Sequence, residues 1–462
     1  MSQPFSFFLV TDIHYFEPAL GAEGPAYERR SRVDQKCIAE TGAIIDAEFA
    51  RIAADTETNT VIIPGDLVFD GEKASHLGVL KRLQYLKDHG KRVLLITARH
   101  DYNDYSRGFV GEEQVEVEHT NREELPGLYH AYGWDDAINV YRDGFSYVSQ
   151  LTDKIRMLAL NCDGDTKDFK GLYPEQLAWA KEQIKKAHDD GCYIFAITHY
   201  PLLPGSNIMK LIGDAKLTDW EQTADFLADA GLDLIFTGHM HMQSLTEHVS
   251  PGGNKITDIC TGSLVGCPAY YRRVTFMEDG RIDIQSIPTG EFAWKDKGDR
   301  TAAEYFQWRF DRMITDLVDA MADDFEFFAN KFGGVEKMKK FKAPITFVGK
   351  GLKKWNIGTL GRLLCFKVDP SVKDRLLKDV GVEFVRNIFI GDEPYVKGTP
   401  IYDVMDKLLN RLKPVLAIAG KKIKGGVSAD YLKDFVLSLI GDENRRDHTA
   451  VLETSAMQYL TK

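Results

Sequence analysis

The feature that most constrains the fold is an alternation of short apolar runs with longer helical patterns across the first 290 residues. The runs are rich in β-branched and aromatic residues and end in polar residues, as buried strands do. Between them, apolar residues recur at spacings of three and four, which predicts packed helices over 35–54, 74–89 and 174–188. This alternation is typical of a layered α/β domain. The predicted strands are 5–10, 60–63, 92–97, 156–160, 193–197, 232–236 and 255–260.

A change of pattern near residue 300 divides the chain. Residues 272–277 and 281–286 alternate apolar and polar side chains around Asp279 and Gly280, which predicts a hairpin. Beyond it, the spacing predicts amphipathic helices over 301–332, 371–389, 400–419 and 428–440. We therefore predict two domains, an α/β domain over 1–295 and a helical domain over 296–462.

Charge follows the same division. The formal net charge is −11, from 58 Lys and Arg against 69 Asp and Glu. Residues 1–299 hold 30 basic against 47 acidic residues, a net −17, whereas 300–462 hold 28 against 22, a net +6. Eleven of the twelve histidines lie at or before His248. An acidic first domain repels polyanions, which argues against a nucleic-acid polymer as partner.

The sequence also bears on location. No stretch reaches the roughly 18 apolar residues of a membrane span, and the first ten residues lack the basic start of a secretory leader. The six cysteines include no C-x-x-C pair, which argues against a disulfide scaffold. We therefore expect a cytoplasmic protein with no membrane partner.

Acidic and imidazole side chains follow the predicted strands at their carboxyl ends, where open α/β sheets place their sites. Carboxylates and imidazoles that meet there form a mixed oxygen and nitrogen ligand set, which suits Mn²⁺, Fe or Zn²⁺ better than Ca²⁺ or Mg²⁺. The side chains are Asp12 and His14, Asp66, His100 and Asp101, His199, and His239 and His241.

This ordered set resembles the calcineurin-like metallophosphoesterase family, whose pattern is D-x-H, G-D, G-N-H-[DE], H and G-H-x-H. The resemblance covers residues 5 to about 290. The stretches 127–138 and 261–272 also look like bacterial members described as cyclic-nucleotide phosphodiesterase-like, which carry a C-terminal helical domain. The resemblance implies a four-layer α/β/β/α sandwich of two mixed sheets followed by an all-α domain.

The resemblance further implies a binuclear metal centre. One divalent ion would be bound by Asp12, His14 and His241, the other by His199 and His239, with Asp66 bridging both. Two such ions, about 3.5 to 4 Å apart, can hold a hydroxide for in-line attack on phosphorus. His100 would donate a proton to the leaving group, and Asp101 would orient His100.

One position departs from the pattern: Arg99 stands where the family has the asparagine ligand. Arginine has no acceptor atom and stays cationic, so Arg99 cannot ligate a metal ion. In one interpretation Arg99 takes the place of the second ion, leaving one metal, and contacts phosphate with its planar fork. In another, Arg99 turns away into a salt bridge and leaves a weaker second site. In a third, the protein binds phosphorylated ligands without turning them over.

Three residues are candidates for contact with the substrate. Tyr102 and Tyr271 could line a pocket that stacks on a base, and Arg272 could meet phosphate. The alternative is ordinary packing at a sheet edge.

These observations favour a hydrolase of phosphodiester or phosphomonoester bonds in small, nucleotide-like substrates. A phosphoprotein phosphatase and a phospholigand-binding module are the alternatives. The helical domain could cap the site, clamp the first domain or form a homo-oligomer.

Overall fold

The computed structural model describes residues 4–141, 145–163, 169–210, 212–332, 334–421, 426–442 and 446–461. The chain divides into two compact units. The first comprises Met1–Gln307 together with Arg446–Lys462, and the second comprises Trp308–Arg445. The predicted division at residues 295 and 296 stays a prediction, and the structure adds the return of the C-terminal segment to the first unit.

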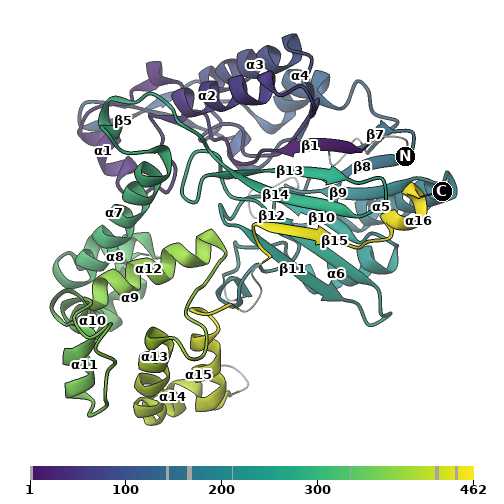
Figure 1. Ribbon diagram of the computed structural model, residues 1–462. Coiled ribbons are helices and arrows are strands. Elements are labelled where there is room, and N and C mark those ends of the chain that lie inside the picture. Colours follow the sequence, from purple (N-terminus) through teal and green to yellow (C-terminus); the bar gives the residue numbers. More distant parts are fainter. Residues whose placement is uncertain are drawn as a thin grey trace. The chain divides into compact units, whose positions relative to one another are not determined.

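The described part of the first unit contains two large sheets and a small hairpin (Figure 1). The first sheet has the order β15 (Thr449–Leu452), β14 (Ile282–Pro288), β13 (Tyr270–Phe276), β1 (Phe5–Leu9), β2 (Thr60–Pro64) and β3 (Arg92–Ile96). The second has the order β11 (Ser244–Val249), β12 (Lys255–Cys260), β10 (Leu234–Thr237), β9 (Tyr193–Ile197), β8 (Ile155–Ala159), β7 (Ser146–Thr152) and β6 (Asn139–Tyr141). The hairpin pairs β4 (Ser106–Val110) with β5 (Glu113–Val117).

Both sheets are mixed. In the first, β1, β2 and β3 run parallel, whereas β13 pairs antiparallel with β1. In the second, β8, β9, β10 and β12 run parallel, and β7 and β11 are antiparallel to their neighbours. The parallel strands of each sheet therefore end at the same edge, and the residues that follow these strands lie along that edge.

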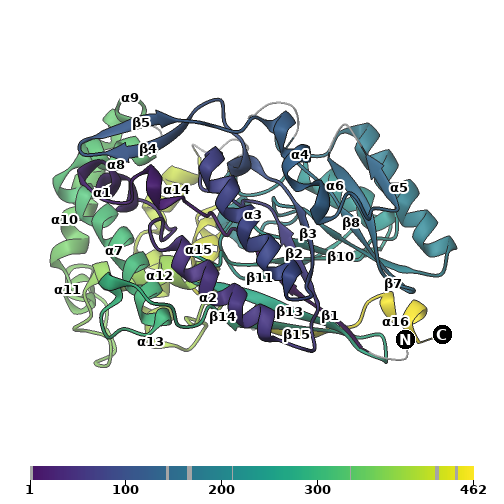
Figure 2. The same ribbon diagram turned by 90° about the horizontal axis from the view of Figure 1, so that it is seen from above.

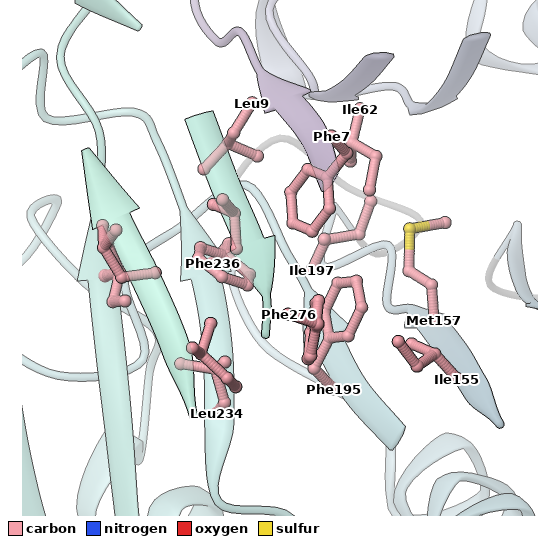
Figure 3. Packing of buried hydrophobic residues seen from close by; sticks show 14 of the residues in the cluster. Phe7, Leu9, Ile62, Ile155, Met157, Phe195, Ile197, Leu234, Phe236 and Phe276 are labelled. Carbon is pink, nitrogen blue, oxygen red and sulfur yellow. The ribbon is translucent and has the colours of Figure 1, made fainter. Parts of the chain in front are cut away.

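The two sheets pack face to face on an apolar core (Figure 3). Phe7 of β1 stacks on Phe195 of β9, with ring centroids 5.5 Å apart, and meets Phe236 of β10 edge-on at 5.6 Å. Because strand side chains alternate, Phe7 and Leu9 face this core while Phe8 faces the opposite side.

Helices cover the outer faces of the sheets (Figure 2). Helices α2 (Thr41–Ala54) and α3 (Lys73–Asp88) lie on the first sheet, and α5 (Pro174–Asp189) and α6 (Trp220–Asp229) lie on the second. The predicted four-layer α/β/β/α sandwich with a helical C-terminal region is confirmed. The remaining helices of the first unit are the short α1 (Pro25–Ser31), α4 (Leu125–Tyr129) and α16 (Ala456–Leu460).

The helices and strands described in the second unit are all helices, joined by turns and extended segments, and the first of them begins in the first unit. The predicted helix over 301–332 is two helices, because Asp324 ends the first and its carboxylate accepts a hydrogen bond from Phe327 N at 3.1 Å to cap the second. The predicted helix over 400–419 is likewise divided. The helices are α7 (Ala302–Asp323), α8 (Phe325–Lys331), α9 (Val335–Met338), α10 (Lys342–Lys354), α11 (Ile357–Leu363), α12 (Leu377–Ile390), α13 (Pro400–Arg411), α14 (Lys413–Gly420) and α15 (Ala429–Leu437). Within the described residues, every helix is too short or too polar to traverse a lipid bilayer.

Candidate metal centre

The predicted ligands follow strands that belong to both sheets. Asp12 and His14 follow β1 and Asp66 follows β2, in the first sheet. In the second sheet, His199 follows β9, and His239 and His241 follow β10. The site therefore lies where the carboxyl ends of the two sheets meet.

The backbone at this site is strained. Among the described residues, nine that are not glycine have a positive φ, and five of these are Asp12, His14, Asp66, His239 and His241. Such a conformation costs about 1 to 3 kcal/mol for each residue and persists only where the surroundings enforce it. Strain of this kind concentrates at functional sites.

Close packing enforces this backbone at two glycines. Gly65 has a φ of +95°, and a β-carbon there would lie 2.9 Å from His199 Nδ1. A β-carbon on Gly238 would lie 2.5 Å from Asp12 Oδ2. Only glycine therefore lets the strand ends approach each other this closely.

Three of the side chains converge in a first group: Asp12, His14 and His241. The Nε2 atoms of His14 and His241 lie only 2.9 Å apart. Asp12 Oδ1 lies 3.6 Å from the first of these nitrogens and 3.4 Å from the second. Three donor atoms that point at one another in this way are arranged to share a cation.

A second group adjoins the first and consists of Asp66, His199 and His239. Asp66 Oδ2 lies 3.1 Å from His199 Nε2 and 3.6 Å from His14 Nε2, so this carboxylate stands between the two groups. His199 Nε2 is buried and faces carboxylate oxygens of Asp66 at 3.1 Å and of Asp12 at 3.9 Å. A buried nitrogen beside a carboxylate fits a metal ion that is bound by both.

Hydrogen bonds to backbone carbonyls set which imidazole nitrogen faces the site. His14 Nδ1 lies 3.3 Å from the Val68 carbonyl oxygen, and His199 Nδ1 lies 2.8 Å from that of Pro64. In each, Nδ1 donates and Nε2 keeps its lone pair for the site. In His239 the assignment reverses, because Nε2 lies 2.6 Å from the Asp214 carbonyl oxygen and Nδ1 is left for the site. Partners of this kind orient the imidazoles of metal sites.

Burial and neighbouring charges shift the pKa values of the Asp12 and Asp66 carboxyl groups in opposite directions. Burial alone would raise the pKa of Asp12, but the imidazoles of His241 and His14 outweigh it and hold that pKa well below its usual range. The same balance, with His199 as the strongest neighbour, holds the pKa of Asp66 low. Both carboxylates are therefore ionised.

The imidazoles divide into two kinds. Burial lowers the pKa of His14 to about 4, and burial together with His199 lowers that of His239 to about 3. Burial would also lower the pKa of His199, but Asp66 and Asp12 raise it to about 10. The two carboxylates thus stabilise a positive charge at His199 Nε2, and a divalent cation beside this atom would provide that charge in place of a proton.

His100 lies beside the first group, and its contacts correct one prediction. Its ring meets that of His14 edge-on with centroids 4.9 Å apart, and its Nδ1 donates to the Phe69 carbonyl oxygen at 2.6 Å. The predicted pairing of His100 with Asp101 is therefore wrong. Burial and Lys36 lower the pKa of His100 well below its usual range.

Asp101 instead holds the loops of the site together. Its Oδ1 accepts from the backbone N–H groups of Leu67 at 2.6 Å and Val68 at 3.1 Å, and its Oδ2 accepts from that of Ala98 at 2.7 Å. These bonds tie the segment after β3 to the segment after β2. Asp101 is thus a positioning residue for the loop that carries Asp66.

Arg99 is half-buried, and no described carboxylate forms an ion pair with it. The carboxyl group of Asp163 and the hydroxyl groups of Tyr102 and Tyr200 are the described groups on which its charge acts. The interpretation in which Arg99 turns into a salt bridge therefore has no partner among the described residues.

Of the three predicted substrate contacts, only Tyr102 lies near Arg99 and Asp163. It follows the 3-10 turn Arg99–Asp101, and the charges of Asp163 and Arg99 act on its hydroxyl, whose pKa burial raises. Tyr271 is buried and packs on Phe8 with ring centroids 5.9 Å apart, on the face of the first sheet that is away from the central core.

Arg272 does not fit a role in binding phosphate. It is 1% exposed, and its guanidinium donates to protein acceptors on every side. The side chain of Arg272 is therefore part of the packed interior around β13, which agrees with the alternative prediction of ordinary packing. The acceptors are Thr261 Oγ1, Ser286 Oγ, Gln243 Oε1 and the carbonyl oxygens of Cys260 and Asp447.

One buried carboxyl group that acts electrostatically on the second ligand group was not predicted from the sequence: Asp163. It is 3% exposed, lies beyond the end of β8, and its Oδ1 has no hydrogen-bond partner in the described structure. Burial raises its pKa to about 7 against the opposing effect of His199. Its position after a predicted strand is a signal of the same kind as that of the predicted ligands.

The calcineurin-like phosphoesterase family model matches residues 5–243, more than half of the chain, and the chain belongs to this family. It is therefore a member of a hydrolase family whose sites bind divalent metals. No curated protein matches its sequence.

Solved structures that resemble it include a dimetal phosphatase from Danio rerio, at 14% identity over 63% of this chain and 98% of that chain, with a TM-score of 0.45. Another is a purple acid phosphatase from yellow lupin (Lupinus luteus) seeds, at 11% identity over 63% of this chain and 53% of that chain, with a TM-score of 0.39.

Proposed function

We propose that the protein hydrolyses phosphodiester or phosphomonoester bonds of small, nucleotide-like substrates at a binuclear metal centre. The observation that carries this proposal is the pair of adjoining ligand groups, with Asp66 Oδ2 within 3.6 Å of an imidazole nitrogen in each. Membership of the phosphoesterase family supports the class of reaction.

The donor atoms fit two divalent ions of Mn, Fe or Zn. Each group offers one carboxylate and two imidazoles, a set that these metals accept more readily than Ca²⁺ or Mg²⁺ does. In this proposal Asp66 bridges the two positions. When bound, the ions would activate water and stabilise negative charge on the phosphoryl oxygens.

The chain's own residues then bind and protonate the substrate. His100 keeps Nδ1 on the Phe69 carbonyl, so Nε2 is the atom that meets the leaving-group oxygen. An anionic substrate beside Nε2 would raise the lowered pKa of His100, so that the imidazole takes up a proton from solvent and then donates it to the leaving-group oxygen.

Arg99 contributes a second positive charge. Its guanidinium group is half-buried and offers five donors in a planar fork that suits a phosphate group. We therefore propose that Arg99 binds the substrate beside two ions and does not replace one. Tyr102, whose hydroxyl lies near the same charges, is the predicted aromatic contact that stays a candidate.

The substrate class rests on charge and on resemblance. A net charge of −17 over residues 1–299 disfavours polymeric nucleic acid, whereas a small phosphorylated compound experiences only the cationic site. The likeness of residues 127–138 and 261–272 to cyclic-nucleotide phosphodiesterase-like proteins favours a nucleotide and a diester.

The test is metal quantification on the purified protein together with Mn²⁺-dependent hydrolysis of an aryl phosphodiester and an aryl phosphomonoester. We expect about two ions per chain and turnover of at least one ester. Asp66→Asn should lose both, whereas Asp258→Asn is the matched control, because Asp258 is an equally buried carboxylate held by Leu203 N and Thr237 Oγ1. A wild-type protein that binds no transition metal and turns over neither ester would refute the proposal.

A further inference from the structure

The positive charge of the helical part of the chain is concentrated in one segment, residues 331–354. This segment holds eight lysines against a single acidic residue, Glu336, a net charge of +7. Residues 300–462 as a whole hold 28 basic and 22 acidic residues, so those outside the segment hold 20 and 21, a net charge of −1. The excess positive charge of this part of the chain therefore comes entirely from residues 331–354.

The same segment exposes aromatic side chains. Among the described residues, the three most exposed phenylalanines are Phe332, Phe341 and Phe347, and Phe347 is 67% exposed. Val348 beside it is also exposed. Single exposed apolar residues are ordinary, but lysines that only keep a helix face in water need no phenylalanines among them. The segment thus combines cationic and apolar side chains on its surface.

One side of helix α10 is packed on α7. A β-carbon on Gly349 would lie 2.6 Å from Ala322 N of α7, so the two helices touch at this glycine. Lys353 Nζ lies 3.6 Å from Asp319 Oδ1 of α7 and also pairs with Asp323. These contacts fix which side of α10 faces the protein.

A second side of α10 presents an aromatic ring and two cations to solvent. Phe347, Lys350 and Lys354 follow one another at spacings of three and four residues, which places them on one face of the helix. All three are exposed, and neither lysine forms an ion pair with a described residue. Just before the helix, Lys340 and Phe341 are exposed together, with Lys340 Nζ 5.0 Å from the ring centroid of Phe341.

We infer that this surface docks the protein onto an anionic lipid bilayer. The lysines meet the phosphate groups of the lipids, and the phenylalanines enter the boundary between head groups and acyl chains, as in helices that lie on a membrane. The docking face consists of Lys339, Lys340, Phe341, Phe347, Lys350 and Lys354. This inference does not depend on the proposed function. The expectation of no membrane partner came from the lack of a spanning segment, and a helix on the surface of a bilayer needs none.

The apolar side chains decide which anionic partner fits the docking face. A bilayer offers phosphate groups above an apolar layer, so its lysines and phenylalanines gain free energy together. Nucleic acid offers phosphate groups and bases but no apolar layer for the exposed Val348 beside Phe347. The net charge of −17 over residues 1–299 also disfavours a long polyanion.

The experiment is cosedimentation of the full chain with vesicles of phosphatidylcholine alone and of phosphatidylcholine mixed with phosphatidylglycerol. We expect the protein to bind the mixed vesicles at least about tenfold more tightly, because each lysine near an anionic surface contributes a factor of about five. Raising the salt concentration from about 0.1 to about 1 M should release the protein, since the Debye length falls from about 10 to about 3 Å.

Substitutions separate the two kinds of side chain. Lys350→Gln combined with Lys354→Gln should weaken binding about 25-fold. Phe347→Ala should weaken it about 5- to 10-fold, because less apolar surface leaves water on binding. Helix α3 carries the matched controls: Leu77 is 52% exposed, and Lys81, four residues later, is also exposed. Leu77→Ala and Lys81→Gln remove the same kinds of side chain away from the docking face and should bind as the wild type does.

A wild-type protein that binds neither kind of vesicle, or both equally, would overturn the inference. Unchanged binding by either docking-face variant, with its fold confirmed by circular dichroism, would do the same. Binding to a single-stranded oligonucleotide without binding to the vesicles would assign the face to nucleic acid and would also overturn the inference. Metal content and ester turnover are separate measurements, since the docking face includes none of the predicted metal ligands.

Discussion

At the scale of single residues, the candidate metal centre depends on strain that its neighbours enforce. Asp12 has a φ of 53°, yet its carboxylate accepts from Thr11 Oγ1 at 2.6 Å and from His239 N at 3.0 Å, and its carbonyl accepts from Ser263 Oγ at 2.7 Å. These bonds come from three separate segments. The ligand geometry is therefore set before any ion arrives, which favours tight binding.

His100→Ala should separate catalysis from metal binding. We expect turnover to fall about 10²- to 10⁴-fold because the proton donor is lost, while both ions remain. Within the described residues, the ring donates a hydrogen bond to the Phe69 carbonyl oxygen, and the backbone bond from His100 N to Asp66 Oδ1 survives the substitution. Steady-state kinetics and metal content on the same preparation are the measurements. His130→Ala, at an exposed histidine, is the control, and loss of metal from His100→Ala would show that His100 is a ligand.

Arg99→Ala should weaken substrate binding more than chemistry. A charge-assisted hydrogen bond contributes about 1.5 to 3 kcal/mol, so we expect KM to rise roughly 10- to 100-fold with two ions still bound. Arg99→Lys keeps the charge without the planar fork and should fall between the alanine variant and the wild type. An unchanged KM in Arg99→Ala would show that the guanidinium does not touch the substrate.

At the scale of elements, the carboxyl ends of the strands place the chemistry and the loops fix its orientation. Asp101 joins the segments after β2 and β3, and Asn161 joins the ends of β3 and β8. Helix α3 begins directly after the first of these loops, with Glu72 as its N-cap residue. The start of α3 therefore fixes one end of the loop that carries Asp66.

Glu72 should make stability depend on pH. It is fully buried, and burial raises its pKa to about 7 from the usual 4.5. Between these values the unfolded chain loses the proton while the folded chain keeps it, so stability should fall as pH rises from about 4.5 to 7, by roughly 3 kcal/mol in all. Above pH 7 this contribution is constant.

Glu72→Gln removes this titration, so the fall between pH 4.5 and 7 should be smaller in the variant by that amount. Urea unfolding of both proteins at a series of pH values is the measurement. Parallel pH profiles for the wild type and Glu72→Gln would contradict the prediction.

At the scale of the whole molecule, the C-terminal segment completes the first unit. Strand β15 pairs antiparallel with β14, and Leu452 enters the core between the sheets with 5% of its surface exposed. The unit that carries the candidate metal centre therefore needs residues from both ends of the chain.

Leu452→Ala should destabilise the first unit by about 2 to 5 kcal/mol, because it removes a buried side chain and leaves a cavity. Val451 on the same strand is 50% exposed, so Val451→Ala is the matched control and should change stability by no more than about 1 kcal/mol. Urea unfolding followed by circular dichroism distinguishes the two. Equal effects of both substitutions would mean that β15 does not belong to the core.

Much of the fold could be predicted from local patterns. Strand β9 has the predicted bounds, Tyr193–Ile197, and β1, β2 and β3 differ from their predicted ranges by a single residue. Strands β4, β5, β6, β7, β11 and β15 were not predicted, because short or half-exposed strands have weak periodicity and are stabilised by the strands with which they pair.

The sequence by itself determined the order of strands and helices, and it placed acidic and imidazole side chains at the strand ends, because hydrophobic periodicity and motif spacing are local properties. Only the tertiary structure decided which of these side chains meet. It paired Asp101 with backbone N–H groups, enclosed Arg272 among protein acceptors, buried Asp163 beyond the end of β8 and returned β15 to the first sheet. Each of these outcomes depends on burial and on partners far away in the chain. Neither the burial of a side chain nor the identity of a distant partner can be predicted from the spacing of residues.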